Sequence, residues 1–154
     1  MAKKPTAADA QVILQLYDLR REAEIRKARN WWLVTFWPNT ADDVIKVASA
    51  LGTQENNYFR QVAGYWDMAA ALVLHGTIHP ELFVEGGVSG EMFFIYAKLQ
   101  PLLKELREKM QSPGLFSNVE KVIMSTKAGR ERLKTIAARV ESRRKAMSET
   151  AKAS

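Results

Sequence analysis

Two histidines stand close enough in the sequence to suggest a metal site. His75 and His79 are four residues apart, and Glu81 follows them. That spacing serves a metal only when both histidines lie on the same face of one helix. Gly76 predicts the end of a helix between them, and no third nitrogen ligand stands inside the pair. We therefore predict no metal site: His75 should end a helix, and His79 should precede a turn at Pro80.

A glycine-rich stretch could also bind an anion. The sequence GGVSG, residues 86–90, could cradle a phosphate if it led into the N-terminus of a helix. It lacks the lysine and the serine or threonine of a P-loop, and Glu85 and Glu91 flank it with the wrong sign of charge. We interpret the stretch as a turn between two helices.

No set of residues is arranged for catalysis. Cysteine is absent, no serine has the setting of a nucleophile elbow, and no carboxylate pair is placed for acid and base chemistry. Asp67 is the one acid in a strongly apolar stretch, GYWDMAAALVL. It could be a buried, tuned carboxylate, but we expect a structural acid that is hydrogen-bonded or partly exposed. The sequence therefore predicts a non-catalytic protein without a cofactor.

Three of the four tryptophans lie in ARNWWLVTFWPN, residues 28–39. As a strand this stretch would be apolar on both faces, and the chain offers no partner strand. As a helix it continues a core stripe through Trp32 and Phe36 and leaves Trp31 and Trp37 on the flanks. Because each tryptophan can bury about 200 Å², such a cluster usually anchors packing. We predict core positions for Trp32, Phe36 and Trp66, with Trp31 and Trp37 as candidates for a protein-binding patch; contact with a membrane surface is the weaker alternative.

The positive charge of the chain is concentrated at its C-terminal end. Through Thr126 there are 14 basic and 14 acidic residues, whereas nine basic and three acidic residues follow. This end alone can attract polyanions. The candidate polyanion-binding residues are Lys127, Arg130, Arg132, Lys134, Arg139, Arg143, Arg144 and Lys145. A solvated basic helix is the competing interpretation, and no aromatic residue lies among these eight to stack a base.

The elements that must position these residues are helical. Thr6 predicts the cap of a first helix with the stripe Val12, Leu16, Leu19 and Ala23. A second stripe, Ile25, Ala28, Trp32 and Phe36, should end at Pro38. Two further helices are predicted: one is capped by Thr40 and ends at Gly52, and the next is capped by Thr53 and ends at Gly76.

The second half of the chain continues the helical pattern. Pro80 can open a brief turn, and a long amphipathic segment after residue 90 should break at Pro101. SPG, residues 112–114, predicts a loop, and Ser117 with Glu120 predicts a capping box. The last stripe is Leu133, Ile136, Val140 and Met147. We expect an all-α bundle of five to seven helices, with a core domain over 1–113 and an extension over 114–154 that packs on the same core and is basic from residue 127.

Three stretches resemble a family of small bacterial all-helical domains of unknown function. They are LYDLRREAEIRKARNWW, YFRQVAGYWDMAAALVLHGTIHPELF and YAKLQPLLKELREKM, and they span roughly residues 16–110. The resemblance implies an all-α fold and no chemistry. It does not account for EGGVSGEMFF or for the basic end from Lys127.

A chain of 154 residues can bury a single core without metals or disulfides. The absence of cysteine fits a reducing compartment, the N-terminus lacks an apolar signal region, and no window approaches the ~20 apolar residues of a membrane span. We therefore expect a cytoplasmic protein without a transmembrane segment. Its predicted function is that of a helical interaction or scaffold module with a protein partner, itself or another; the alternative is a binder of nucleic acid or an anionic surface.

Overall fold

The computed structural model describes residues 3–154, and every regular element in this range is helical. The all-α fold predicted from the sequence is confirmed, but the α-helices of residues 3–154, α1 to α9, exceed the five to seven that were predicted. In chain order the elements are α1 (Ala7–Leu19), α2 (Ala23–Asn30), the π-helical turn η1 (Trp31–Thr35), α3 (Ala41–Ser49), α4 (Gln54–Leu74), α5 (Pro80–Phe83), α6 (Gly86–Leu99), the 3₁₀ turn η2 (Gln100–Leu102), α7 (Leu103–Lys109), α8 (Ser117–Ser125) and α9 (Lys127–Ala153).

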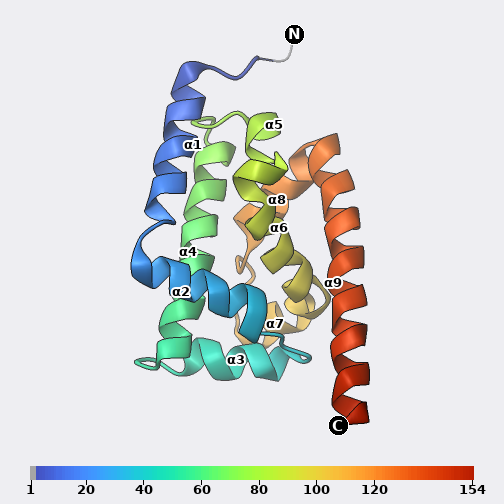
Figure 1. Ribbon diagram of the computed structural model, residues 1–154. Helices are drawn as coiled ribbons and strands as arrows, with labels where there is room; N and C mark the ends of the chain where they lie inside the picture. The colour runs from blue at the N-terminus through green and yellow to red at the C-terminus, as the bar shows by residue number, and fades with distance from the viewer. Residues whose placement is uncertain (1–2) are drawn as a thin grey trace.

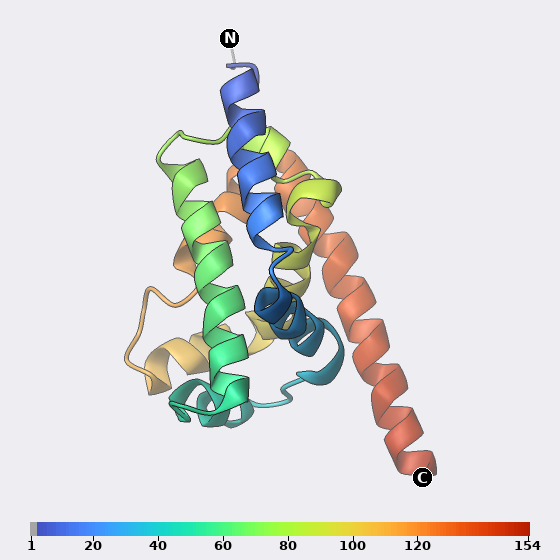
Figure 2. The same cartoon turned by 60° about the vertical axis from the view of Figure 1, so that its left-hand side comes forward.

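The helices form one bundle around α4 and α6. Helices α1, α4 and α9 run along the length of the molecule, and α2 and α3 cross its lower half (Figure 1). α4 packs against α2 and α8, whereas α9 packs against α6 and α8. Figure 2 shows α9 along one edge of the bundle, with its C-terminal end reaching past its neighbours. No helix within residues 3–154 combines the length and the apolar character that crossing a membrane requires.

Threonine caps begin three helices where the sequence predicted them. The Thr6 hydroxyl accepts a hydrogen bond from the backbone N–H of Asp9, 3.4 Å away, and the Asp9 carboxylate accepts one from the N–H of Thr6, 2.7 Å away. Thr40 and Asp43 form the same reciprocal pair at α3, and Thr53 caps α4. Each cap stabilises its helix by about 1 kcal/mol, because it satisfies N–H groups that have no partner within the helix.

The first predicted stripe is divided between two helices. α1 ends at Leu19, and a turn precedes α2, so the stripe from Val12 to Ala23 does not continue on one face. Leu16 is buried as predicted, but Leu19 is 53% exposed. The core position predicted for Leu19 is therefore wrong, because the chain leaves the helix at this residue.

The tryptophan stretch is helical, but its winding changes. α2 ends at Asn30, and the N–H of Phe36 then donates to the carbonyl of Trp31, 2.9 Å away, which closes a π-helical turn. The continuous α-helix predicted here is wrong, since Phe36 itself is extended. Trp32, Phe36 and Trp66 are nevertheless buried, so their predicted core positions are confirmed.

The glycine-rich stretch is the first turns of α6 rather than a turn between helices. α6 begins at Gly86, directly after its cap residue Glu85. Ser89 bends the helix with a non-helical backbone, and its hydroxyl donates to the carbonyl of Phe83, 2.6 Å away. The predicted turn is wrong for Gly86, Gly87 and Val88, which are helical, whereas the chain does change direction at Ser89. Beyond them α6 is buried almost all round, and the break predicted at Pro101 is present as η2.

The start of α8 differs from the predicted capping box. Phe116, with φ of +55°, precedes the helix, and Ser117 is already its first residue. The Ser117 side chain therefore does not cap the helix. Glu120 accepts a hydrogen bond from Arg107 instead, so the predicted capping box is wrong. The loop predicted at residues 112–114 is present.

The predicted stripe of α9 is buried over part of its length. The Thr126 hydroxyl caps the helix, and Leu133 and Val140 are buried against the bundle. Met147 is 42% exposed, so its place in the predicted stripe is wrong. The physical reason is that the last turns of α9 extend beyond the helices that cover its first half (Figure 2).

Candidate interaction surface at Trp37 and helix α9

The histidine pair does not share a helical face. His75 is the C-terminal cap of α4, and Gly76, with φ of +77°, turns the chain away. His79 precedes α5, and its backbone N–H donates to the carboxylate of Asp9, 2.7 Å away. Within residues 3–154, no group of three or more histidine, aspartate or glutamate side chains could hold a metal ion. Asp67 is half-buried and accepts a hydrogen bond from Asn118, 3.3 Å away, as expected of a structural acid.

Two of the eight basic candidates on α9 are held inside the structure. Arg132 lies 3.8 Å from the carboxylate of Glu85 and over the ring of Phe93. Arg144 is bonded to backbone carbonyls outside α9. These contacts stabilise the docking of α9 and leave the two side chains little freedom to bind a partner.

The other six candidates face solvent. Arg130 donates to the carbonyl of Met124, 2.6 Å away. Two of the lysines lie near glutamates one turn away in α9, at 3.8 and 4.0 Å. We call these six exposed residues the α9 outer face: Lys127, Arg130, Lys134, Arg139, Arg143 and Lys145.

The two candidate tryptophans have different surroundings. The Trp31 ring stacks on Phe36 with centroids 4.5 Å apart, and its other neighbours in a shallow groove include Arg26, Lys27 and Tyr58. Trp37 lies at the opposite end of η1, where it meets the ring of Phe94. The two side chains therefore do not form one patch.

Tertiary packing brings Trp37 next to α9. The guanidinium carbons of Arg143 and Arg144 lie 5.5 and 5.8 Å from the centre of the Trp37 ring, and the ammonium of Lys98 lies 4.2 Å from it. A residue proposed for a protein-binding patch and two residues proposed for polyanion binding thus form one cluster. We call Trp37, Lys98, Arg143 and Arg144 the Trp37 cluster.

Lys98 is a functional candidate that the sequence did not reveal. Its side chain is fully buried, and its ammonium donates to the carbonyl of Trp32, 2.6 Å away, and to the carbonyl of Phe36. It therefore caps the carbonyl end of η1, where a cation is favourable. Burial, followed by the positive charges of Arg144 and Arg143, lowers the pKa of Lys98 to about 7. Its one signal in the sequence is that it is the only charged residue in MFFIYAKL.

Arg144 connects α9 to the same corner of the bundle. It donates to the carbonyl of Pro38, 2.6 Å away, to the side-chain oxygen of Asn39, 3.2 Å away, and to the carbonyl of Lys98, 3.3 Å away. The guanidinium carries its N–H donors on a rigid planar fork, and two of its nitrogens serve these three acceptors.

A hollow of about 200 Å³ opens beside the cluster. Its walls are partly apolar, from Trp37, Met147 and Ala151, and partly polar, from Asn39 and Arg144. The buried indole nitrogen of Trp37 has no hydrogen-bond partner within residues 3–154. The hollow is therefore partly apolar and has the cation Arg144 in its wall.

A second buried polar group, Glu91, was not predicted from the sequence. Glu91 accepts from Arg29, 2.6 Å away, and from the indole N–H of Trp66, 3.0 Å away. Its side chain is almost inaccessible to solvent. This network joins α2, α4 and α6 and leaves no free polar group of Glu91 for chemistry, so it supports the fold.

Most of the chain, up to the start of α9, matches a known family. A family model described as a domain of unknown function, DUF4760, matches residues 5–126. The chain belongs to this family. The DUF4760 match extends beyond the stretches that carried the resemblance in the sequence and ends directly before α9 begins. No curated protein and no solved structure matches the chain.

Proposed function

We propose that the chain is a non-catalytic helical interaction module that binds an acidic protein segment along the α9 outer face. The hollow beside Trp37 would receive one apolar side chain of that segment. The DUF4760 match covers the scaffold, and α9 adds the basic surface to it.

The observation that carries the proposal is the Trp37 cluster. The exposed Arg143 and the partly buried Arg144 lie beside one indole ring, and neither is paired with a carboxylate within residues 3–154. Unbalanced cations at an interface favour an acidic partner and speed its association. The apolar wall of the neighbouring hollow supplies area that a partner side chain can bury.

The surface favours a protein segment over a nucleic acid. Lys98 lies 4.2 Å from the centre of the Trp37 ring, and Arg143 and Arg144 lie 5.5 and 5.8 Å from it, so these cations compete with a base for the ring. Glutamates also interrupt the α9 outer face, at Glu131 and Glu141. A surface of mixed sign fits the interspersed charges of a protein better than the uniform charge of a phosphate backbone.

Binding of nucleic acid or an anionic surface is the second candidate. It is supported by the excess of six positive charges that lies entirely from Lys127 onward. We propose a cytoplasmic location under either candidate function, and the absence of cysteine fits such a reducing compartment.

The test compares two triple variants of equal charge. Arg139→Gln, Arg143→Gln and Lys145→Gln together remove cations from the α9 outer face and leave the structural Arg144 in place. The control replaces exposed cations elsewhere: Lys46→Gln, Arg60→Gln and Lys121→Gln. The probes are fluorescent poly-L-glutamate and an oligothymidylate of similar charge, followed by anisotropy at low and high salt.

We expect poly-L-glutamate to bind the wild-type protein and the control variant, and to bind the α9 variant at least about tenfold more weakly. Trp37→Leu changes no charge but should still weaken binding, because Arg143 and Arg144 lose the aromatic ring beside which they lie. Binding of the oligonucleotide but not of poly-L-glutamate would favour the second candidate. Equal binding by the two triple variants would exclude α9 as the interaction surface.

A further inference from the structure

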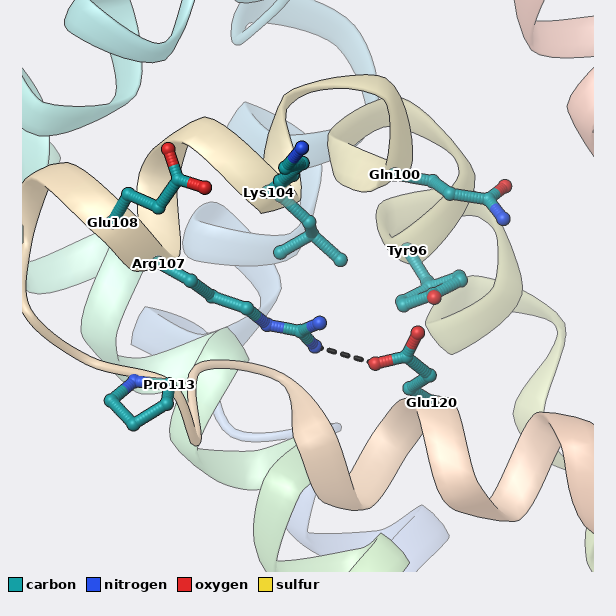
Figure 3. A pocket seen from close by; sticks show the side chains of 8 residues that line it. Tyr96, Gln100, Lys104, Arg107, Glu108, Pro113 and Glu120 are labelled. Carbon is teal, nitrogen blue, oxygen red and sulfur yellow. Dashed lines mark hydrogen bonds and ion pairs between the residues drawn. The ribbon is translucent and has the colours of Figure 1, made fainter.

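A cavity of about 420 Å³ lies on another side of the molecule, between α6, α7 and α8. Figure 3 shows the side chains that line it, with Arg107 and Glu120 pointing toward one another and Tyr96 beside Glu120. The volume falls within the roughly 300–1,000 Å³ of typical ligand sites. Neither the basic α9 outer face nor the Trp37 cluster contributes to these walls.

Arg107 is fixed in the cavity by two of its three nitrogen atoms. Its Nε donates to the carbonyl of Leu115, 3.0 Å away, and one terminal nitrogen donates to the carboxylate of Glu120, 2.6 Å away. The other terminal nitrogen has no hydrogen-bond partner within residues 3–154. A guanidinium held in this way can offer its remaining N–H groups to an incoming carboxylate at little entropic cost.

Glu120 supplies the opposite charge in the same cavity. One of its oxygens is bonded to Arg107, and its side chain is 37% exposed. Burial, and then the charge of Glu120, raise the pKa of the Tyr96 hydroxyl well above its ordinary value. Tyr96 therefore remains a neutral hydrogen-bond donor beside the carboxylate of Glu120.

The loop that closes the cavity is held in an unusual backbone conformation. Gln111 and Phe116 have φ of +50° and +55°, although neither is glycine. At Gln111 this is the left-handed residue of a Schellman motif that ends α7, because the N–H groups of Gln111 and Ser112 donate to the carbonyls of Glu108 and Arg107. At Phe116 such a conformation costs about 1–3 kcal/mol. Here they place the loop carrying Pro113 and Leu115 against α7, which keeps the cavity walls in position.

We propose that this cavity binds a small zwitterion of the α-amino acid class. The ligand carboxylate would bind the free side of Arg107, and its ammonium would bind Glu120, so that the four charges alternate. Its side chain would lie on the apolar wall formed by Leu103 and Pro113. Lys104 stands at the rim without an ion pair within residues 3–154 and attracts the carboxylate end. This inference is independent of the function proposed for α9.

The test uses three probes with the same hydrocarbon chain. L-norvaline carries both charged groups, pentanoate lacks the ammonium, and butylamine lacks the carboxylate. In ¹⁵N-labelled protein, millimolar norvaline should shift the Arg107 Nε–H signal saturably. Pentanoate and butylamine should each bind at least about tenfold more weakly than norvaline, since each leaves one charge of the cavity without a partner.

A matched pair of variants assigns the binding to the cavity. Glu120→Gln should weaken norvaline binding about tenfold. Glu55→Gln should leave it unchanged, because Glu55 is exposed in the first turn of α4 and does not line the cavity. If Glu120→Gln is not folded, Tyr96→Phe provides the second variant and should weaken binding severalfold. Equal shifts with norvaline and pentanoate, or no shift with any probe in the wild-type protein, would overturn the proposal.

Discussion

Arg144 donates a hydrogen bond from α9 to the backbone carbonyl of Pro38, 2.6 Å away, and so joins two parts of the chain that are 106 residues apart. Pro38 ends the tryptophan stretch, and its carbonyl is one of three acceptors that Arg144 reaches. Part of the charge that appeared in the sequence as a polyanion site is therefore used to hold α9 on the bundle.

Replacement of Arg144 by glutamine should lower the free energy of unfolding by about 1.5–3 kcal/mol, because bonds from a charged donor to partly buried carbonyls are lost. The neighbouring Arg143→Gln is the control and should change it by less than about 0.5 kcal/mol, since Arg143 is exposed. Urea denaturation measures both. Similar free energies of unfolding for the two variants would show that the hydrogen bonds of Arg144 do not stabilise the fold.

The stability of the protein should rise with pH through the range in which Lys98 titrates. The pKa of Lys98 is lowered to about 7 from 10.5, so between these values the unfolded chain binds more protons than the folded one. Stability then increases with pH by up to about 1.4 kcal/mol per unit. Below about pH 7 this gain is absent, because Lys98 is charged in both states.

The matched variants for this prediction are Lys98→Met and Lys121→Met. Lys98→Met should remove the rise in stability between about pH 7 and pH 9, whereas Lys121→Met, at an exposed position, should retain it. Urea denaturation at several pH values gives the comparison. Parallel pH profiles for the wild-type protein and Lys98→Met would contradict the titration of Lys98 in this range.

Trp32→Ala should cost about 3–5 kcal/mol, because it opens a cavity in the core and leaves the carbonyl of Tyr58 without its indole donor. Native tryptophan emission should also be blue-shifted and largely shielded from iodide. Trp31→Ala should cost less, since Trp31 is only partly buried. Wild-type stability of Trp32→Ala would contradict a core position for this tryptophan.

Two glycines inside helices should respond to alanine with opposite signs. At Gly129 an added Cβ would lie 2.3 Å from the carbonyl oxygen of Ile123, so Gly129→Ala should destabilise the start of α9. At Gly64 nothing lies within 4 Å of such a Cβ, so Gly64→Ala should stabilise α4 by about 0.4–1 kcal/mol. Thermal denaturation distinguishes the two. An increase in Tm for both variants would show that the close approach at Gly129 relaxes without cost.

The sequence by itself determined most of the local structure. Helical periodicity and threonine caps predicted the all-α fold and the starts of α1, α3 and α4, because these features depend on residues within one turn of each other. The burial of Trp32 and Trp66 also followed from their place on apolar stripes. Where longer-range contacts compete with local patterns, as for Glu120 at the start of α8, the prediction was wrong.

Only the tertiary structure decided which distant side chains meet. From the sequence alone, Lys98 is a charged residue on a helix. In the structure its ammonium is buried, because it donates hydrogen bonds to the carbonyls of Trp32 and Phe36. Trp37 and Arg144 come together because α9 packs along α6. The crossing of two helices depends on the whole interlocking surface between them, and helical periodicity in one segment carries no information about that surface.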